Sequence, residues 1–363
     1  MTRPRSLLVH AQKSGVYHCH SRCVRRAFLC GRDPLTQQDY SHRKEWLRNL
    51  MMELSTIFFI DVCGYAIMPN HFHIILRNRP DLADKVTDEE VAIRWYRLFP
   101  RRRNQYFEPE DPTPKEIDDV LARADGAGTL RKHLTSISWF MRCLKEPIAR
   151  RANKEDQCTG RFWEGRFKSV ALLDQAAILA CSAYVDLNPI RAGLAKTPEE
   201  SEFTSVKERI VAHKAQKKKS GRADSDSGGG RRYSGRRNDW LCPLMDQTDR
   251  KGYLNLSFAE YLQILEATGR QLAPGKSGRI PDHLESILVR LGIKPDQWQR
   301  GSQSFGSLFF NAVGKPSNLE KAARETGRKW FRGKQSCAAI FIDHPDQGEP
   351  TNPRDPSATR MVA

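Results

Sequence analysis

The fold is decided by the stretch AIMPNHFHIIL, residues 66–76. A Pro-Asn pair in its middle is typical of a turn, and apolar or β-branched residues flank this pair on both sides. The stretch therefore predicts two strands, 56–67 and 71–76, joined by a tight turn. Side chains alternate between the two faces of a strand, so His71 and His73 are expected on one face. Two neutral imidazoles placed in this way can bind one divalent cation together.

The segments around this hairpin complete an α+β pattern. Residues 16–23 predict a further strand, residues 41–55 a helix, and residues 130–152 a long helix with a regular apolar stripe. Residues 80–130 interrupt the pattern as an insertion in which two capping boxes start helices. These capping boxes are Thr87 with Glu90 and Thr113 with Glu116. The order predicts an antiparallel sheet with helices on one side.

Tyr184 and Asn188 lie four residues apart in a predicted helix that Asp174 caps. Positions i and i+4 share one helical face, so a phenol and an amide oxygen could face the same ion. Packing is the commoner role of a single helical tyrosine. Pro189 ends or kinks the helix, which leaves the direction of the amide open.

Basic and aromatic residues alternate in GRFWEGRFKS, residues 160–169. Such alternation is typical of segments in which bases stack on aromatic rings and phosphates pair with cations. We expect Arg161, Trp163, Arg166 and Lys168 to contact nucleic acid, while some aromatic rings of the segment belong to the core.

The overall charge agrees with a polyanionic partner. Sixty Lys and Arg residues stand against 43 Asp and Glu, which gives a formal net charge of +17. Nine cysteines without a C-x-x-C pair suit reduced thiols rather than a disulfide framework. No apolar run reaches the roughly 18 residues of a membrane span, so we expect a cytoplasmic protein.

Composition divides the chain into four parts. We expect a catalytic domain over 1–212 that contains the insertion. A basic linker over 213–237 follows, since it is low in apolar residues and contains the run Gly228–Gly230. Capping signals and amphipathic stripes predict a helical accessory domain over 238–343, and residues 344–363 are expected to be disordered.

Four stretches together resemble the single-tyrosine HUH transposases, in particular the REP-associated tyrosine transposases. They are GVYHCHSR (15–22), AIMPNHFHIIL (66–76), GRFWEGRFKS (160–169) and YVDLNPIRAGL (184–194). Their order matches that family over roughly residues 10–210, apart from the insertion. The resemblance implies a ferredoxin-like HUH catalytic domain, and it leaves the region after about residue 238 unexplained.

The resemblance also implies residue roles and partners. His71 and His73 match the pair that holds Mg²⁺ or Mn²⁺, Asn188 matches the helical residue that completes the metal site, and Tyr184 matches the nucleophile. The implied reaction cleaves and rejoins single-stranded DNA, often with a hairpin, through a 5′-phosphotyrosine link. Monomer and homodimer both remain open.

Three alternatives remain beside this hypothesis. One is a domesticated DNA-binding protein of the same fold that acts on repeat sequences without transposition, and another is a metal-dependent RNA endonuclease. The third concerns the site: His18 and His20, with Cys19 and Cys23 nearby, could bind zinc. Their spacing matches no familiar zinc finger, and ordinary strand residues have the same pattern.

Overall fold

The structure is a computed structural model of the 363-residue chain, and most of the sequence is described in it. The described residues are 13–24, 30–33, 37–106, 109–123, 126–220, 240–270 and 281–343. The predicted tail 344–363 and residues 221–237 of the predicted linker lie outside them. The start of that linker, in contrast, continues a helix to Ser220.

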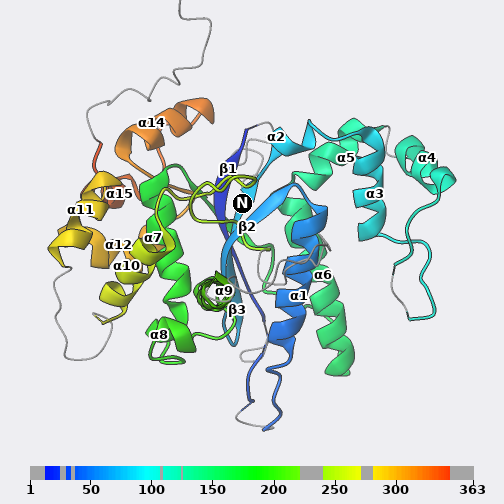
Figure 1. The fold of residues 1–363 in the computed structure, drawn as a ribbon, viewed down its shortest axis with the longest axis horizontal. Coiled ribbons are helices and arrows are strands. Elements are labelled where there is room, and N and C mark those ends of the chain that lie inside the picture. The colour runs from blue at the N-terminus through cyan, green and yellow to red at the C-terminus, as the bar shows by residue number, and fades with distance from the viewer. Residues whose placement is uncertain are drawn as a thin grey trace, which may run out of the picture.

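A five-stranded sheet runs through the middle of the molecule (Figure 1). Its order is β2-β3-β1-β4-β5, and all neighbours are antiparallel except β4 and β5. The hairpin predicted from residues 66–76 is confirmed as β2 and β3. The strands are β1 (Gly15–Arg22), β2 (Ile60–Ile67), β3 (His71–Asn78), β4 (Lys168–Leu172) and β5 (Ala312–Val313).

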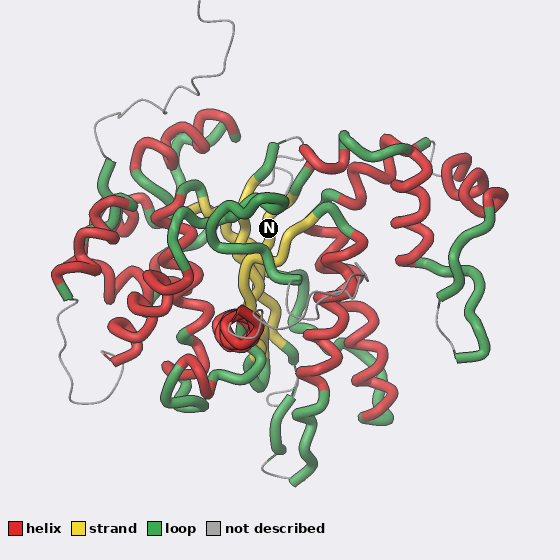
Figure 2. Tube along the Cα trace, in the orientation of Figure 1, coloured by secondary structure: helices red, strands yellow, loops and turns green. Residues whose placement is uncertain are grey.

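Helices α1 (Arg43–Ile57) and α6 (Ile137–Glu155) lie side by side on one face of the sheet (Figures 1 and 2). Arg43 of α1 is fully buried and pairs with Glu155 and Asp156 at the end of α6. A buried charge is tolerated only where partners replace its lost hydration, so this cluster ties the two helices together.

The opposite face of the sheet is covered as well. Helix α7 (Gln175–Asp186) packs across it, and α9 (Ser205–Ser220) follows beside β2 (Figure 1). The expectation that helices lie on one side of the sheet is therefore wrong. Residues of α7 are buried on nearly every side, because the helix is enclosed between the sheet and the C-terminal part of the chain.

The insertion forms a small helical group at the far edge of the molecule from the C-terminal helices (Figure 1). The capping box of Thr113 with Glu116 is confirmed in both directions, whereas Thr87 caps its helix through its hydroxyl while the Glu90 carboxylate bonds to Arg94. The helix expected over 130–152 is two helices, because the Ser136 hydroxyl caps a new start. The helices of the insertion are α2 (Pro80–Ala83), α3 (Asp88–Leu98), α4 (Pro114–Arg123) and α5 (Ala127–Leu134).

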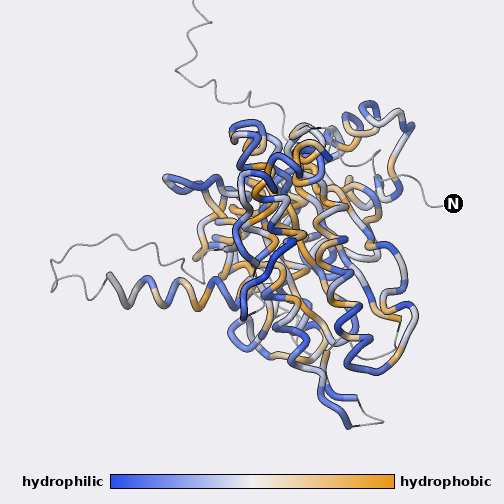
Figure 3. Tube along the Cα trace, turned by 90° about the vertical axis from the view of Figure 1, so that its right-hand side faces the viewer, coloured by the Kyte–Doolittle hydropathy of each residue, from blue (hydrophilic) through white to orange (hydrophobic). Residues whose placement is uncertain are grey.

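The region 240–343 contains helices, as expected, and it also joins the sheet. Its short strand β5 extends the sheet beyond β4, and the backbone N–H of Cys242 donates to the carbonyl of Val62 in β2. Its buried apolar residues belong to the same hydrophobic cluster as those around the sheet. Figure 3 shows that many hydrophobic segments of the trace run through the interior of the molecule. The helices are α10 (Phe258–Arg270), α11 (Asp282–Arg290), α12 (Trp298–Gln303), α13 (Phe305–Leu308), α14 (Pro316–Glu325) and α15 (Lys334–Ile340).

None of the helices in the described ranges has the length and apolar character that crossing a membrane requires.

Candidate functional site

Four histidines lie together on the face of the sheet that α7 covers. The register of β1 and β3 places His20 opposite His73, and His18 and His71 share the face of these two residues. The ring centroid of His73 lies 5.1 Å from that of His18, 5.5 Å from that of His20 and 4.9 Å from that of His71. The prediction that His71 and His73 share one face is confirmed.

All four imidazoles are neutral at pH 7. Burial, together with the nearby His20, lowers the pKa of His18 from 6.5 to about 3. Burial likewise lowers the pKa of His71 and of His20 to about 4, and holds the pKa of His73 well below 6.5. A neutral imidazole keeps one nitrogen lone pair free, which is the form that binds a cation.

Two of the histidines share a buried hydrogen bond. Nε2 of His18 and Nδ1 of His73 are 2.9 Å apart, and both side chains are almost completely buried. Their other ring nitrogens, His18 Nδ1 and His73 Nε2, have no hydrogen-bond partner among the described residues. The His71 ring contacts the Asn70 side-chain oxygen through Nδ1, at 2.6 Å. The outer nitrogen of His73 is therefore a buried polar atom without a partner in the part of the chain that the structure describes.

Tyr184 extends from α7 over this cluster. Its ring meets the edges of His73 and His18 with centroids 5.5 Å and 6.1 Å away. The guanidinium of Arg191 lies over the ring, 4.2 Å from its centroid, and Phe305 packs against the ring at 5.6 Å. A half-buried tyrosine is thus fixed between a cation and an aromatic ring, with the neutral histidines along its edge.

The C-terminal region supplies part of these surroundings. Arg191 donates a hydrogen bond to the carbonyl of Gln303, at 2.9 Å. A methyl group added at Gly306 would lie 2.9 Å from the Tyr184 hydroxyl, so the backbone of α13 closely approaches that oxygen. The sequence resemblance did not cover this region. No local signal in the sequence would have placed Phe305 or Gly306 beside Tyr184.

Asn188 occupies a different element from the one expected. Helix α7 ends at Asp186, and α8 (Asn188–Arg191) begins after Leu187, with Pro189 in its first turn. The Asn188 side chain is buried, and its Nδ2 has no hydrogen-bond partner within the described part of the chain. A buried amide without a partner carries a cost in free energy, as does the outer nitrogen of His73.

The donor set that the sequence resemblance implies for a divalent cation is two imidazoles and one amide, His71, His73 and Asn188. Within the described ranges, no group of three or more His, Cys, Asp or Glu is arranged to hold a metal. The alternative zinc site of His18, His20, Cys19 and Cys23 is therefore wrong. Cys19 alternates with the two histidines along β1, so its thiol lies on the opposite face, near Ser169.

The basic and aromatic segment 160–169 divides into buried rings and exposed charges. Phe162, Trp163 and Phe167 are buried, and the Trp163 indole N–H donates to the carbonyl of Lys145 in α6. Trp163 is therefore a core residue, which corrects the expectation that it contacts nucleic acid. The expected cations Arg161, Arg166 and Lys168 are exposed.

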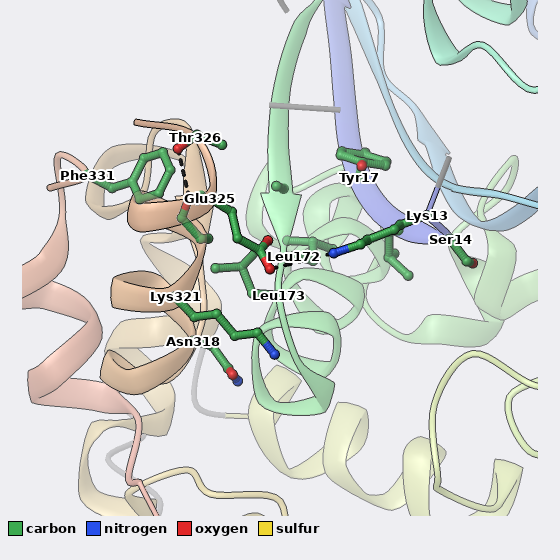
Figure 4. Close-up of a pocket in the computed structure, with 15 residues that line it drawn as sticks. Lys13, Ser14, Tyr17, Leu172, Leu173, Asn318, Lys321, Glu325, Thr326 and Phe331 are labelled. Atoms are coloured by element: carbon green, nitrogen blue, oxygen red, sulfur yellow. Dashed lines mark hydrogen bonds and ion pairs between the residues drawn. The ribbon is translucent and has the colours of Figure 1, made fainter. Parts of the chain in front are cut away.

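A pocket lies elsewhere on the sheet, between its edge and α14 (Figure 4). It has a volume of about 350 Å³ and includes the ion pair of Lys13 with Glu325, at 3.6 Å. Its lining comes from the beginning of β1, the end of β4, and α14. None of the predicted site residues lines it, so the pocket and the histidine cluster are separate features.

No family model and no curated protein matches the sequence. Among solved structures, the chain is similar to a REP-associated tyrosine transposase bound to a REP hairpin. The two share 12% sequence identity, and the likeness covers 70% of this chain and 99% of the other. Its TM-score is 0.33, a value too low to support an argument about fold or function.

Proposed function

We propose that the chain cleaves and rejoins single-stranded DNA, with Tyr184 as nucleophile and a divalent cation, Mg²⁺ or Mn²⁺, beside it. One observation carries the proposal: the tyrosine of α7 lies 5.5 Å from His73, over a cluster of neutral histidines. A nucleophile next to unprotonated imidazoles is an arrangement suited to metal-assisted phosphoryl transfer. The sequence resemblance described above points to the same chemistry.

His71, His73 and Asn188 are the residues that would hold the cation. The support comes from His73 Nε2, which is buried without a hydrogen-bond partner among the described residues and can present a lone pair to an ion, while Asn188 would contribute its amide oxygen. A bound cation polarises a phosphate and stabilises the charge that builds on its oxygens. The lowered pKa values keep the imidazoles unprotonated at neutral pH, so no proton competes with the ion for their nitrogen atoms.

Tyr184 would carry the covalent step. Its phenolic oxygen attacks the phosphorus in line and forms a P–O bond, while the bond from phosphorus to the 3′ oxygen breaks. The phenol loses its proton to water, and the departing 3′ oxygen takes one up. The product is a 5′-phosphotyrosine and a free 3′-hydroxyl. A 3′-hydroxyl can reverse the step and rejoin strands without an external energy source.

The charges around the site suit a DNA backbone. Arg161, Arg166 and Lys168 are exposed just before and at the start of β4, which neighbours the histidine-bearing β1. Lys168 lies close enough to His20 to contribute to the lowering of its pKa. Exposed cations beside a catalytic centre bind phosphates without reading sequence. We therefore assign these three residues to backbone contacts.

A denaturing gel tests the proposal. Protein is incubated with Mn²⁺ and a labelled single-stranded hairpin DNA taken from repeats that flank its own gene. The wild type should give a covalent protein–DNA band, and Tyr184→Phe should give none. His73→Ala should lose the band and keep binding to DNA.

Other outcomes would favour the alternatives. Tight DNA binding by the wild type without any covalent band would contradict cleavage and leave the non-cleaving DNA-binding protein. Cleavage of RNA without a covalent intermediate, unaffected by Tyr184→Phe, would point to a metal-dependent endonuclease. Melting temperatures of all variants, measured in parallel, show whether each one is folded.

A further inference from the structure

We propose that His18 is a positioning residue that orients the His73 ring and accepts its hydrogen bond when His73 binds a metal through the outer nitrogen. In this arrangement His18 Nε2 accepts a hydrogen bond from His73 Nδ1–H, which leaves a free lone pair on His73 Nε2. The inference rests on the proposed function in one respect, namely that His73 is a metal ligand. It is independent of the substrate and of the role of Tyr184.

The argument starts from the hydrogen bond between the two rings. The distance of 2.9 Å requires one hydrogen between His18 Nε2 and His73 Nδ1. Both rings are almost completely buried, which favours the uncharged form with one N–H each, and only two arrangements of that form satisfy the contact. In the first, His18 donates and the proton of His73 lies on Nε2, where it blocks a metal. In the second, His73 donates and its Nε2 is free.

The surroundings do not favour either arrangement. His18 Nδ1 and His73 Nε2 are both buried without a partner in the described part of the chain. The first arrangement leaves the N–H of His73 without an acceptor, and the second leaves the N–H of His18 without one. The two therefore carry the same kind of cost. A cation at His73 Nε2 is compatible only with the second, so its binding selects that tautomer of both rings.

The rings of His20, Tyr184 and Phe305 surround the imidazole of His18 and keep it in place beside His73. Its ring stacks near His20, with centroids 5.7 Å apart, and meets the rings of Tyr184 and Phe305 edge-on at 6.1 Å and 5.8 Å. The side chain is 2% exposed. Since Nε2 faces His73, His18 acts through that ring. Partners of this kind fix the orientation of a ligating imidazole and typically change metal affinity by about 10- to 100-fold.

Two variants of His18 separate its hydrogen bond from its bulk. His18→Phe keeps an aromatic ring in the packed site but removes the acceptor. His18→Gln places an amide oxygen near the position of Nε2 and can still accept the bond. Binding of Mn²⁺ alone, without DNA, is measured by titration calorimetry. We expect the affinity of His18→Phe to fall by about 10- to 100-fold and that of His18→Gln to stay within about 3-fold of wild type.

A second measurement uses only the wild type and so does not depend on a variant that folds. Nitrogen-15 NMR of labelled histidines reports which ring nitrogen carries the proton, with Zn²⁺ as a diamagnetic probe. We expect His18 and His73 to carry their protons on Nδ1 when the metal is bound. A proton on Nε2 of His18 in the loaded protein would overturn the inference.

The outcomes distinguish this inference from the proposed function. Equal Mn²⁺ affinity in wild type and His18→Phe, with binding lost in His73→Ala, would refute the role of His18 and leave the cleavage proposal intact. Loss of affinity in His18→Phe, together with no covalent DNA band in the wild type, would support the inference and remove the cleavage reaction. Absence of Mn²⁺ binding by the wild type would refute both the metal site and the role of His18.

Discussion

The close approach of α13 to Tyr184 makes a single methyl group a sensitive probe of the site. In Gly306→Ala, the new Cβ would lie 2.9 Å from the phenolic oxygen and 3.6 Å from the carbon that bears it. Carbon–oxygen contacts of unbonded atoms need about 3.5 Å. Either the ring or the short helix must therefore move by roughly 0.6 Å.

The expected effect falls mainly on the rate of cleavage. Tyr184, the proposed nucleophile, is held between Arg191 and Phe305, so a shift of its ring tilts its hydroxyl away from its present position. A misplacement of about 1 Å costs about 100-fold in rate, and about 0.6 Å should cost roughly 10-fold. Overpacking lowers the free energy of unfolding by about 1–3 kcal/mol, while replacing glycine by alanine in a helix raises it by up to about 1 kcal/mol. The net loss of stability should be near 1 kcal/mol.

The assay compares the rate of covalent adduct formation with the free energy of unfolding in urea. Gly128→Ala is the matched control, because Gly128 lies in helix α5 and a methyl group there meets no atom within 4 Å. The control should cleave at the wild-type rate. If Gly306→Ala is stable and also cleaves at the wild-type rate, the contact with α13 does not position Tyr184, and our reasoning about the C-terminal region is refuted.

Three further predictions follow from buried contacts. Tyr261→Phe removes a 2.6 Å hydrogen bond to the buried carboxylate of Asp186, and it should lower the free energy of unfolding by about 1.5–3 kcal/mol. An unchanged urea midpoint would contradict this. Trp163→Phe should destabilise the protein, through loss of the bond to Lys145, without changing affinity for DNA; weaker DNA binding by a folded variant would restore a contact role. The four histidines have folded pKa values below 6.5, so the unfolded chain binds more protons in acid, and stability should fall from pH 6.5 towards pH 4. Urea unfolding at pH 7.5 and 5.0 checks this. Each histidine lowers the free energy of unfolding by at most about 1.4 kcal/mol per pH unit, and the raised pKa of Asp186 offsets part of this loss.

Local patterns were sufficient for the elements that carry the site. A turn dipeptide and the alternation of strand residues placed His71 and His73 on one face, and both predicted N-caps of the insertion, Thr87 and Thr113, formed as expected. These features depend on neighbours within a few residues. Their physical causes, strand alternation and side-chain capping, can be read directly from the sequence.

Contacts between distant segments were not predictable in the same way. The partner of His73 is His18, 55 residues away, and the pairing depends on the register of β1 against β3. Trp163 has the same neighbours in sequence as a base-stacking residue would have, and only tertiary packing sends its ring into the core. The enclosure of Tyr184 by Phe305 depends on how the C-terminal region folds back, which no local pattern encodes.

The late position of β5 in the chain has a consequence for the order in which the site is built during translation. Phe305 leaves the ribosome about 120 residues after Tyr184, a delay of roughly 6–24 s at ordinary synthesis rates. Until then β4 is an uncovered edge strand, and Tyr184 lacks the packing of Phe305 against its ring. In a nascent chain that is still attached to the ribosome and its messenger RNA, Tyr184 is therefore present before the residues that pack against it. The protein becomes able to hold that residue in place only after this later segment has been synthesised.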